Sequence, residues 1–229
     1  MKKTIIAGLL LSLASAGAAN AAIIATIAPN GAPAGQTYAT LDSLPLGSAG
    51  GTTSNIGVSF SGPNAAVVTG SLVNNYAAPY FSNGNGAAFG NADGLDTSKY
   101  IAVGVGSSAT LTLGTATQFL GLLWGSVDSF NTLTFYSGNN GSGSVVGTLT
   151  GLNLPSTGAN GDRGPNGTAY ININSTQAFS SLVLTSSVNA FELDNIAYGP
   201  NQVPVPEPVS IALLGAGLAG LAAVRRRRK

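Results

Sequence analysis

The sequence predicts an all-β body in which two antiparallel sheets pack face to face. The interior has no long stretch of helical periodicity, and its short β-rich runs are broken by Gly, Asn, Ser and Pro about every 8–12 residues. Several runs also alternate between apolar and polar residues, which is typical of half-buried strands in a sandwich. A body of this length, residues 22–203, is sufficient for one domain with a sizeable core.

The predicted strands follow one another through this body. Leu111 and Leu113 alternate with threonines, and the wholly apolar run 119–124 predicts a central strand. The predicted strands are Ile23–Ile27, Thr37–Leu41, Asn55–Phe60, Ala65–Val73, Tyr100–Val105, Ala109–Leu113, Phe119–Val127, Thr132–Tyr136, Ser144–Thr150, Ala169–Ile173, Ser181–Thr185 and Phe191–Tyr198.

Composition excludes several kinds of chemistry. The 229 residues include no His and no Cys, so a Cys/His zinc site, a thiol nucleophile, a disulfide framework and a His-based triad are all excluded. Most basic residues lie at the two ends, and the body carries two bases against seven acids, a net charge of −5. A body this acidic lacks the basic surface that nucleic-acid binding needs.

The N-terminus has the three parts of a secretory signal peptide. Two lysines precede an apolar run, and small residues follow, with Ala19 and Ala21 matching the A-x-A cleavage pattern. We therefore expect residues 1–21 to be a signal peptide cleaved after Ala21. The alternative, a short membrane anchor, is disfavoured because the apolar core is too short to span a bilayer.

The C-terminal segment 204–229 also has three parts. A Pro-Glu-Pro motif precedes an apolar run over 209–224, which we expect to be a single transmembrane helix. The run is slightly shorter than the roughly 17–25 residues that usually span a bilayer, but snorkelling of Arg225 and its neighbours extends its reach. A basic cluster follows and is expected to hold this end in the cytoplasm. The motif residues are Val205, Pro206, Glu207, Pro208 and Ser210, and the basic anchor is Arg225, Arg226, Arg227, Arg228 and Lys229.

This tripartite tail resembles the PEP-CTERM sorting signal of exosortase substrates in Gram-negative bacteria. The same kind of tail is also called an ice-binding protein C-terminal motif, a label that implies no ice binding here. The resemblance implies an inner-membrane precursor that exosortase, a membrane transpeptidase, processes and delivers to the cell surface or an extracellular polymer. The alternative is a plain tail-anchored protein with a chance Pro-Glu-Pro sequence.

Two segments of the body carry a second resemblance. The segments 123–133 and 191–198 resemble patterns in one group of exosortase-dependent surface proteins, with similarity over residues 70–199. The resemblance implies a jelly-roll-like β-sandwich and no established activity. Within 191–198 the pattern of apolar residues is interrupted at 194–195. The residues of this segment that we expect to face inward are Phe191, Leu193 and Ile196.

Acids in these segments and in a nearby loop suggest a calcium site, because extracellular sandwiches often bind Ca²⁺ through clustered loop oxygens. The alternative is turn chemistry, in which Asp and Asn side chains accept backbone N–H bonds. No EF-hand or nonapeptide calcium pattern is present. The candidate calcium ligands are Asp93, Asp96, Asp128, Glu192, Asp194 and Asn195.

An enzyme is not predicted, because no spacing singles out a pair of carboxylates and no His is available to activate a serine. Carbohydrate binding stays open, since aromatic side chains stack on sugar rings, although a lone Trp in an apolar strand is more often part of a core. The aromatic candidates are Tyr76, Tyr80, Phe81, Tyr100 and Trp124.

The sequence as a whole predicts an exported, membrane-anchored surface or matrix protein that exosortase processes. Its body is expected to be structural or adhesive and to need no cofactor other than calcium. The alternative is a carbohydrate- or calcium-binding module delivered by the same route. The expected partners are exosortase, the membrane and extracellular polysaccharide, with no nucleic acid.

Overall fold

The computed structural model describes residues 22–81, 94–154, 160–164 and 166–204. The predicted signal peptide and the whole sorting segment from Val205 onward, including its apolar span, lie outside the described residues. Within the described ranges, no helix has the length and apolar character needed to cross a membrane.

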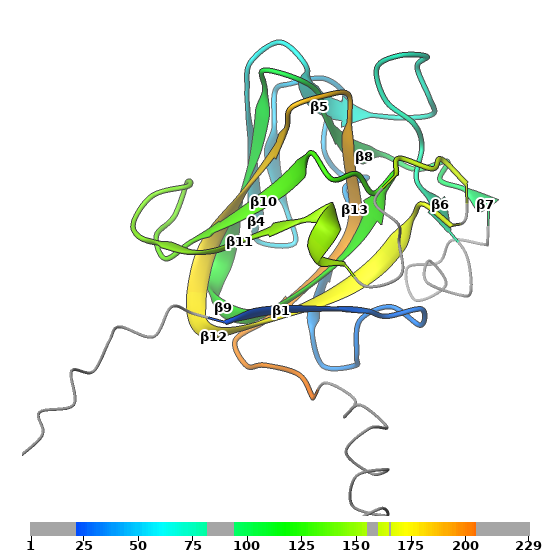
Figure 1. Ribbon diagram of the computed structural model, residues 1–229. Coiled ribbons are helices and arrows are strands. Elements are labelled where there is room, and N and C mark those ends of the chain that lie inside the picture. The colour runs from blue at the N-terminus through cyan, green and yellow to red at the C-terminus, as the bar shows by residue number, and fades with distance from the viewer. Residues whose placement is uncertain (1–21, 82–93, 155–159, 165, 205–229) are drawn as a thin grey trace, which may run out of the picture.

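The described part of the chain is built from strands and one short 3-10 helix, η2 (Gly151–Asn153). All of its strand pairings are antiparallel, which confirms the all-β antiparallel prediction (Figure 1). The strands are β1 (Ile23–Ile27), β2 (Thr37–Ala39), β3 (Gly51–Thr53), β4 (Ile56–Ser61), β5 (Ala65–Val68), β6 (Tyr80–Phe81), β7 (Gly94–Leu95), β8 (Tyr100–Val103), β9 (Ser108–Gly125), β10 (Asn131–Tyr136), β11 (Val145–Thr150), β12 (Ala169–Ser186) and β13 (Phe191–Gly199).

Two long strands, β9 and β12, run through both halves of the main sheet. In one half of the sheet, the first half of β9 pairs with the second half of β12. On their other sides, β9 pairs with β4 and β12 pairs with β10, which in turn pairs with β11. The second half of β9 pairs with the first half of β12 and with β13, and β13 leads on to β8 and β5. Between the halves the register shifts, and residues 114–116 and 176–178 are exposed.

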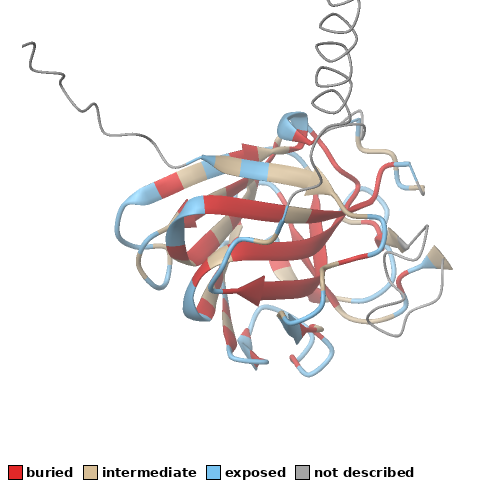
Figure 2. Ribbon diagram, turned by 90° about the horizontal axis from the view of Figure 1, so that it is seen from below, coloured by how far each residue is buried: buried red, intermediate tan, exposed pale blue. Residues whose placement is uncertain are grey.

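The two halves face each other across one hydrophobic core. Leu111 and Leu184 come from one half and Leu122 and Ile171 from the other, and all four are fully buried in the same cluster. In Figure 2 the buried residues are concentrated in the strands and the exposed ones in the connecting loops. Burial of this apolar surface is the main force that holds the folded sheet together.

The predicted strand boundaries were wrong in several places. The run 109–113 and residues 119–125 belong to the single strand β9, and runs 169–173 and 181–185 are parts of β12. Residues 114–116 and 176–178 between the paired runs are exposed but belong to a continuing strand rather than to turns. The run 65–73 ends as a strand at Val68, and strands β3, β6 and β7 were not predicted.

Strand β13 is buried along its whole length because both of its faces are covered. Phe191 and Leu193 point into the main core, as predicted. On the other face lies a second, small cluster of Ala78, Tyr100 and Ala102, with Tyr76 packed against it. The segment between β5 and β6 therefore covers the outer face of the sheet, and acidic residues of β13 are buried beneath it.

Candidate functional site

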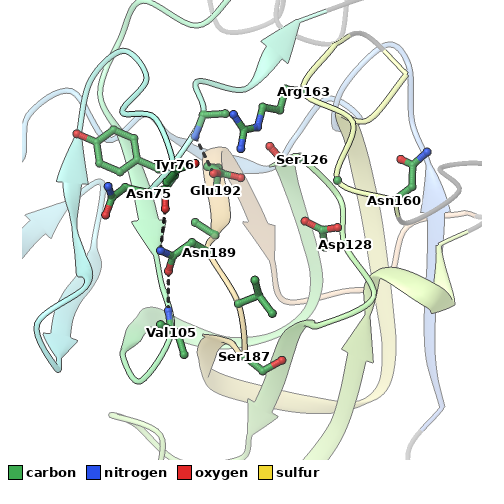
Figure 3. A pocket seen from close by; sticks show the side chains of 15 residues that line it. Asn75, Tyr76, Val105, Ser126, Asp128, Asn160, Arg163, Ser187, Asn189 and Glu192 are labelled. Carbon is green, nitrogen blue, oxygen red and sulfur yellow. Dashed lines mark hydrogen bonds between the residues drawn. The ribbon is translucent and has the colours of Figure 1, made fainter.

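A polar pocket of about 520 Å³ opens beside the start of β13 (Figure 3). Its walls come from five separate stretches of chain: residues 74–77, Val105 after β8, the segment 126–128 after β9, the loop 160–163, and residues 187–192. The volume lies within the range of about 300–1,000 Å³ that is usual for small-molecule sites.

Glu192 lies deepest in this pocket, with only 1% of its surface exposed. It stands on β13 opposite Gly125 of β9, where an added Cβ would lie 3.0 Å from the Cβ of Glu192. The backbone N–H of Ala77 donates to its Oε1 at 2.9 Å, while Oε2 has no partner among the described residues. Glycine at position 125 thus leaves room for this acid to be buried.

The environment of Glu192 favours its neutral form. The pKa of its carboxyl group is raised to about 8; burial is the largest cause, and the charge of Asp128 acts in the same direction. Hydrogen bonds from the Ala77 N–H and the Ser126 side chain, together with the charge of Arg163, act in the opposite direction. At neutral pH this carboxyl group is therefore mostly protonated.

Asp128 forms the opposite wall of the pocket. It is 8% exposed and forms a β-bridge with Asn160, which brings the loop 160–163 against the carboxylate. At Gly161, whose φ is +68°, an added Cβ would lie 2.6 Å from the carboxylate oxygen Oδ1, so a larger residue there would collide with it. Burial raises the pKa of Asp128 to about 6, and the nearby charge of Arg163 partly opposes this.

One asparagine holds three segments of the pocket together. The Nδ2 group of Asn189 donates to the backbone oxygen of Asn74 at 3.0 Å, and its Oδ1 accepts the N–H of Val105 at 3.0 Å (Figure 3). The loop before β13 is thereby joined to the loops after β5 and β8. These two bonds hold the loop before β13 in place, so this wall of the pocket is already formed by hydrogen bonds within the protein.

A second pair of acids, Asp194 of β13 and Asp96 of the loop before β8, is buried away from the pocket. Asp194 is fully buried and Asp96 is 2% exposed. Ser98 donates its backbone N–H to Asp96 at 2.7 Å, and its hydroxyl group lies 3.4 Å from Asp194 Oδ2. Burial, followed by the charge of Asp96, raises the pKa of Asp194 well above its usual range.

The six candidate calcium ligands therefore do not form one site. Asp128 and Glu192 line the pocket, whereas Asp96 and Asp194 form the separate buried pair. Asn195, next to Asp194, has φ +48° in the irregular stretch of β13, and its buried side-chain amide has no partner within the described residues. Asp93 lies outside these residues, which hold no group of three acidic, His or Cys side chains suited to a metal ion.

The aromatic candidates take different places. Trp124 and Tyr100 are fully buried, so the core interpretation of the lone Trp is confirmed. Tyr76 lines the pocket and packs edge-to-face on Tyr100, with ring centroids 6.3 Å apart. Tyr80 is half-buried on β6, and the side chain of Phe81 lies outside the described part.

Most residues of the pocket were missed by the sequence analysis, among them the polar side chains of Ser126, Arg163 and Asn189. For Arg163 a signal was present, since it is one of only two basic residues in the body. Ser126 and Asn189 carried no such signal, because Ser and Asn are abundant throughout this chain.

Comparison with known proteins identifies the C-terminal segment. The family model of the PEP-CTERM protein-sorting motif matches residues 204–228. No curated protein matches the chain. Among solved structures, the K2 cleaved adhesin domain of Lys-gingipain (Kgp) is similar with a TM-score of 0.42 and 14% identity, over 74% of this chain and 100% of that one.

Proposed function

We propose that this chain, a PEP-CTERM sorting-domain protein by the motif at residues 204–228, is an exported bacterial protein processed by exosortase. The sorting motif is the observation that carries the proposal. The precursor is held in the inner membrane by the apolar run 209–224 and the basic cluster that follows it. After processing, the β-sheet body, a jelly-roll-like sandwich, resides at the cell surface or in the extracellular matrix.

The body serves there as a structural or adhesive module rather than as an enzyme. Its surface owes its solubility to Ser, Thr, Asn and Gly, because only 7% of the residues are charged. A surface of this kind suits contact with a hydrated polysaccharide matrix and suits long-range electrostatic steering poorly. The absence of His from the sequence supports a non-enzymatic body, since it removes the commonest general base.

The sorting proposal is tested by replacing Pro206 and Glu207 with alanine together. We expect processing to be lost and the precursor to accumulate in the inner membrane, because the enzyme no longer recognises the motif. Immunoblotting of membrane and surface fractions measures this directly.

A matched control is Asn201→Ala, an exposed residue just before the matched segment, which should be processed like the natural protein. Unchanged processing and surface delivery in the double variant would defeat the proposal.

Calcium binding is a second candidate function, and one observation favours it at the Asp96–Asp194 pair. Oδ2 of Asp96 and Oδ1 of Asp194 are buried and have no partner among the described residues. The charges acting on Asp194 come from the acids Asp96 and Asp42. Two buried carboxyl groups this close together need either a proton that they share or a cation that they both bind. Carboxylate oxygens are the ligands that Ca²⁺ prefers.

For this candidate we expect calcium to raise the melting temperature and EDTA to lower it again. At a calcium concentration of 100 times Kd the shift should be about 5–10 °C. Asp194→Asn should abolish the shift, whereas Glu192→Gln should retain it because Glu192 belongs to the other cluster. Identical melting curves in calcium and EDTA would leave the shared proton as the explanation.

A further inference from the structure

The pocket brings acidic and basic side chains to the same space. They are Asp128, Glu192 and Arg163 among the described residues. The two carboxyl groups supply acceptor oxygens, and the guanidinium group supplies N–H donors. A pocket lined in this way offers hydrogen bonds of both kinds to a neutral polar ligand.

The pocket contains a buried polar atom that lacks a partner. Glu192 Oε2 has no hydrogen bond within the described part of the chain, although the side chain is 1% exposed and faces the pocket (Figure 3). Leaving such an atom unpaired costs free energy, so a ligand that pairs with it gains affinity. A sugar hydroxyl group both donates and accepts hydrogen bonds, so it can pair with a carboxyl oxygen whether or not that oxygen carries a proton.

Other side chains around the pocket can also form hydrogen bonds with a ligand. Asn75 and Ser187 contribute an amide and a hydroxyl group, and the exposed guanidinium of Arg163 brings donors in a fixed plane. Carboxyl, amide and guanidinium groups that converge on a preformed pocket match the ring of hydroxyl groups on a sugar.

We propose that this pocket binds a neutral saccharide, whose hydroxyl groups pair with Glu192, Asp128 and Arg163. The inference rests on the proposed surface function, which brings the body into contact with extracellular polysaccharide. The inference places the proposed adhesive role in this pocket beside β13. The cavity has room for a mono- or disaccharide, so the ligand is one terminal unit or a short stretch of a longer chain.

The test uses the full chain, purified in a zwitterionic detergent without a sugar headgroup. Glucose, galactose, mannose, N-acetylglucosamine and their common disaccharides are titrated by calorimetry, together with glucuronic acid and calcium chloride. We expect at least one neutral sugar to bind, and Arg163→Ala and Asp128→Asn each to weaken that binding about tenfold. Arg163 is exposed, so its replacement leaves the core intact.

Asp42→Asn is the matched control, because Asp42 is an exposed acid outside the pocket, and it should bind like the natural protein. The proposal is overturned if no neutral sugar binds, if calcium alone binds at the pocket, or if both pocket variants bind unchanged. Release of reducing ends from the disaccharides would instead identify a hydrolase and contradict a purely binding role. Because none of these measurements depends on the sorting motif, failure here leaves the proposed export and processing intact.

Discussion

Replacing Trp124 with alanine is expected to lower the free energy of unfolding by about 3–5 kcal/mol. The indole ring is fully buried and stacks on Phe191, with ring centroids 4.4 Å apart and planes 16° apart. Trp124 stands on β9 between Ala169 of β12 and Leu193 of β13, so the cavity would open at the centre of the sheet. The neighbouring strands β12 and β13 cannot move in to fill this cavity, because each is also paired with a further strand on its other side.

Chemical denaturation followed by far-UV circular dichroism measures this loss. Fluorescence is unsuitable because Trp124 is the only Trp in the chain. Trp124→Phe is the matched control: it keeps a ring against Phe191 and removes an indole N–H that has no partner within the described residues, so the loss should stay below about 2 kcal/mol. Equal stability of the alanine variant and the natural protein would contradict the described packing.

Apolar alternation was sufficient to predict most strands of the body. In β10 buried and half-buried residues alternate without exception, and Leu111 and Leu113 are buried between half-buried threonines of β9. The expected interruption at 194–195 is also present, because the pairing of β13 with β9 shifts register between Asp194 and Ala197. These features depend on the sequence of one strand at a time, which is why they could be predicted.

The candidate site could not be predicted in the same way, because it depends on contacts between distant segments. Alternation along β13 suggests that Glu192 and Asp194 face solvent, yet both are buried. The segment between β5 and β6 covers Glu192, and the loop before β8 lies against Asp194. Nothing in either segment indicates which strand it covers. The N–H of Ala77 that fixes Glu192 comes from 115 residues earlier in the chain. The sequence therefore indicated which acids were candidates, but not which of them the fold brings together.

The free energy of unfolding is expected to fall by about 4 kcal/mol as the pH rises from about 4.5 to about 8, owing to Glu192 alone. The pKa of this group is about 8 in the folded chain, against an ordinary value of 4.5. Between these values the folded state keeps a proton that the unfolded state has released. Raising the pH therefore favours the unfolded state, and the contribution is greatest in mild acid. Asp128 and Asp194 have raised pKa values and act in the same direction.

Glu192→Gln isolates this effect. Glutamine has nearly the same shape as the protonated acid and does not titrate, so the variant should match the natural protein near pH 5 and exceed it in stability above pH 8. The window from about pH 7 to about pH 8 is the most informative, because Asp128, whose pKa is about 6, has largely released its proton there. Urea denaturation across this window gives the slope for each protein.

Two further variants should move the upper end of this pH range in opposite directions. Ser126→Ala removes a hydrogen bond that lowers the pKa of folded Glu192, so the loss of stability should continue to a higher pH. Asp128→Asn removes a negative charge that raises this pKa, so the loss should end at a lower pH. A natural protein whose stability increases from pH 5 to pH 8 would show that Glu192 is ionised in the folded state. The neutral pocket would then be replaced by an anionic one, which suits a cation better than a sugar.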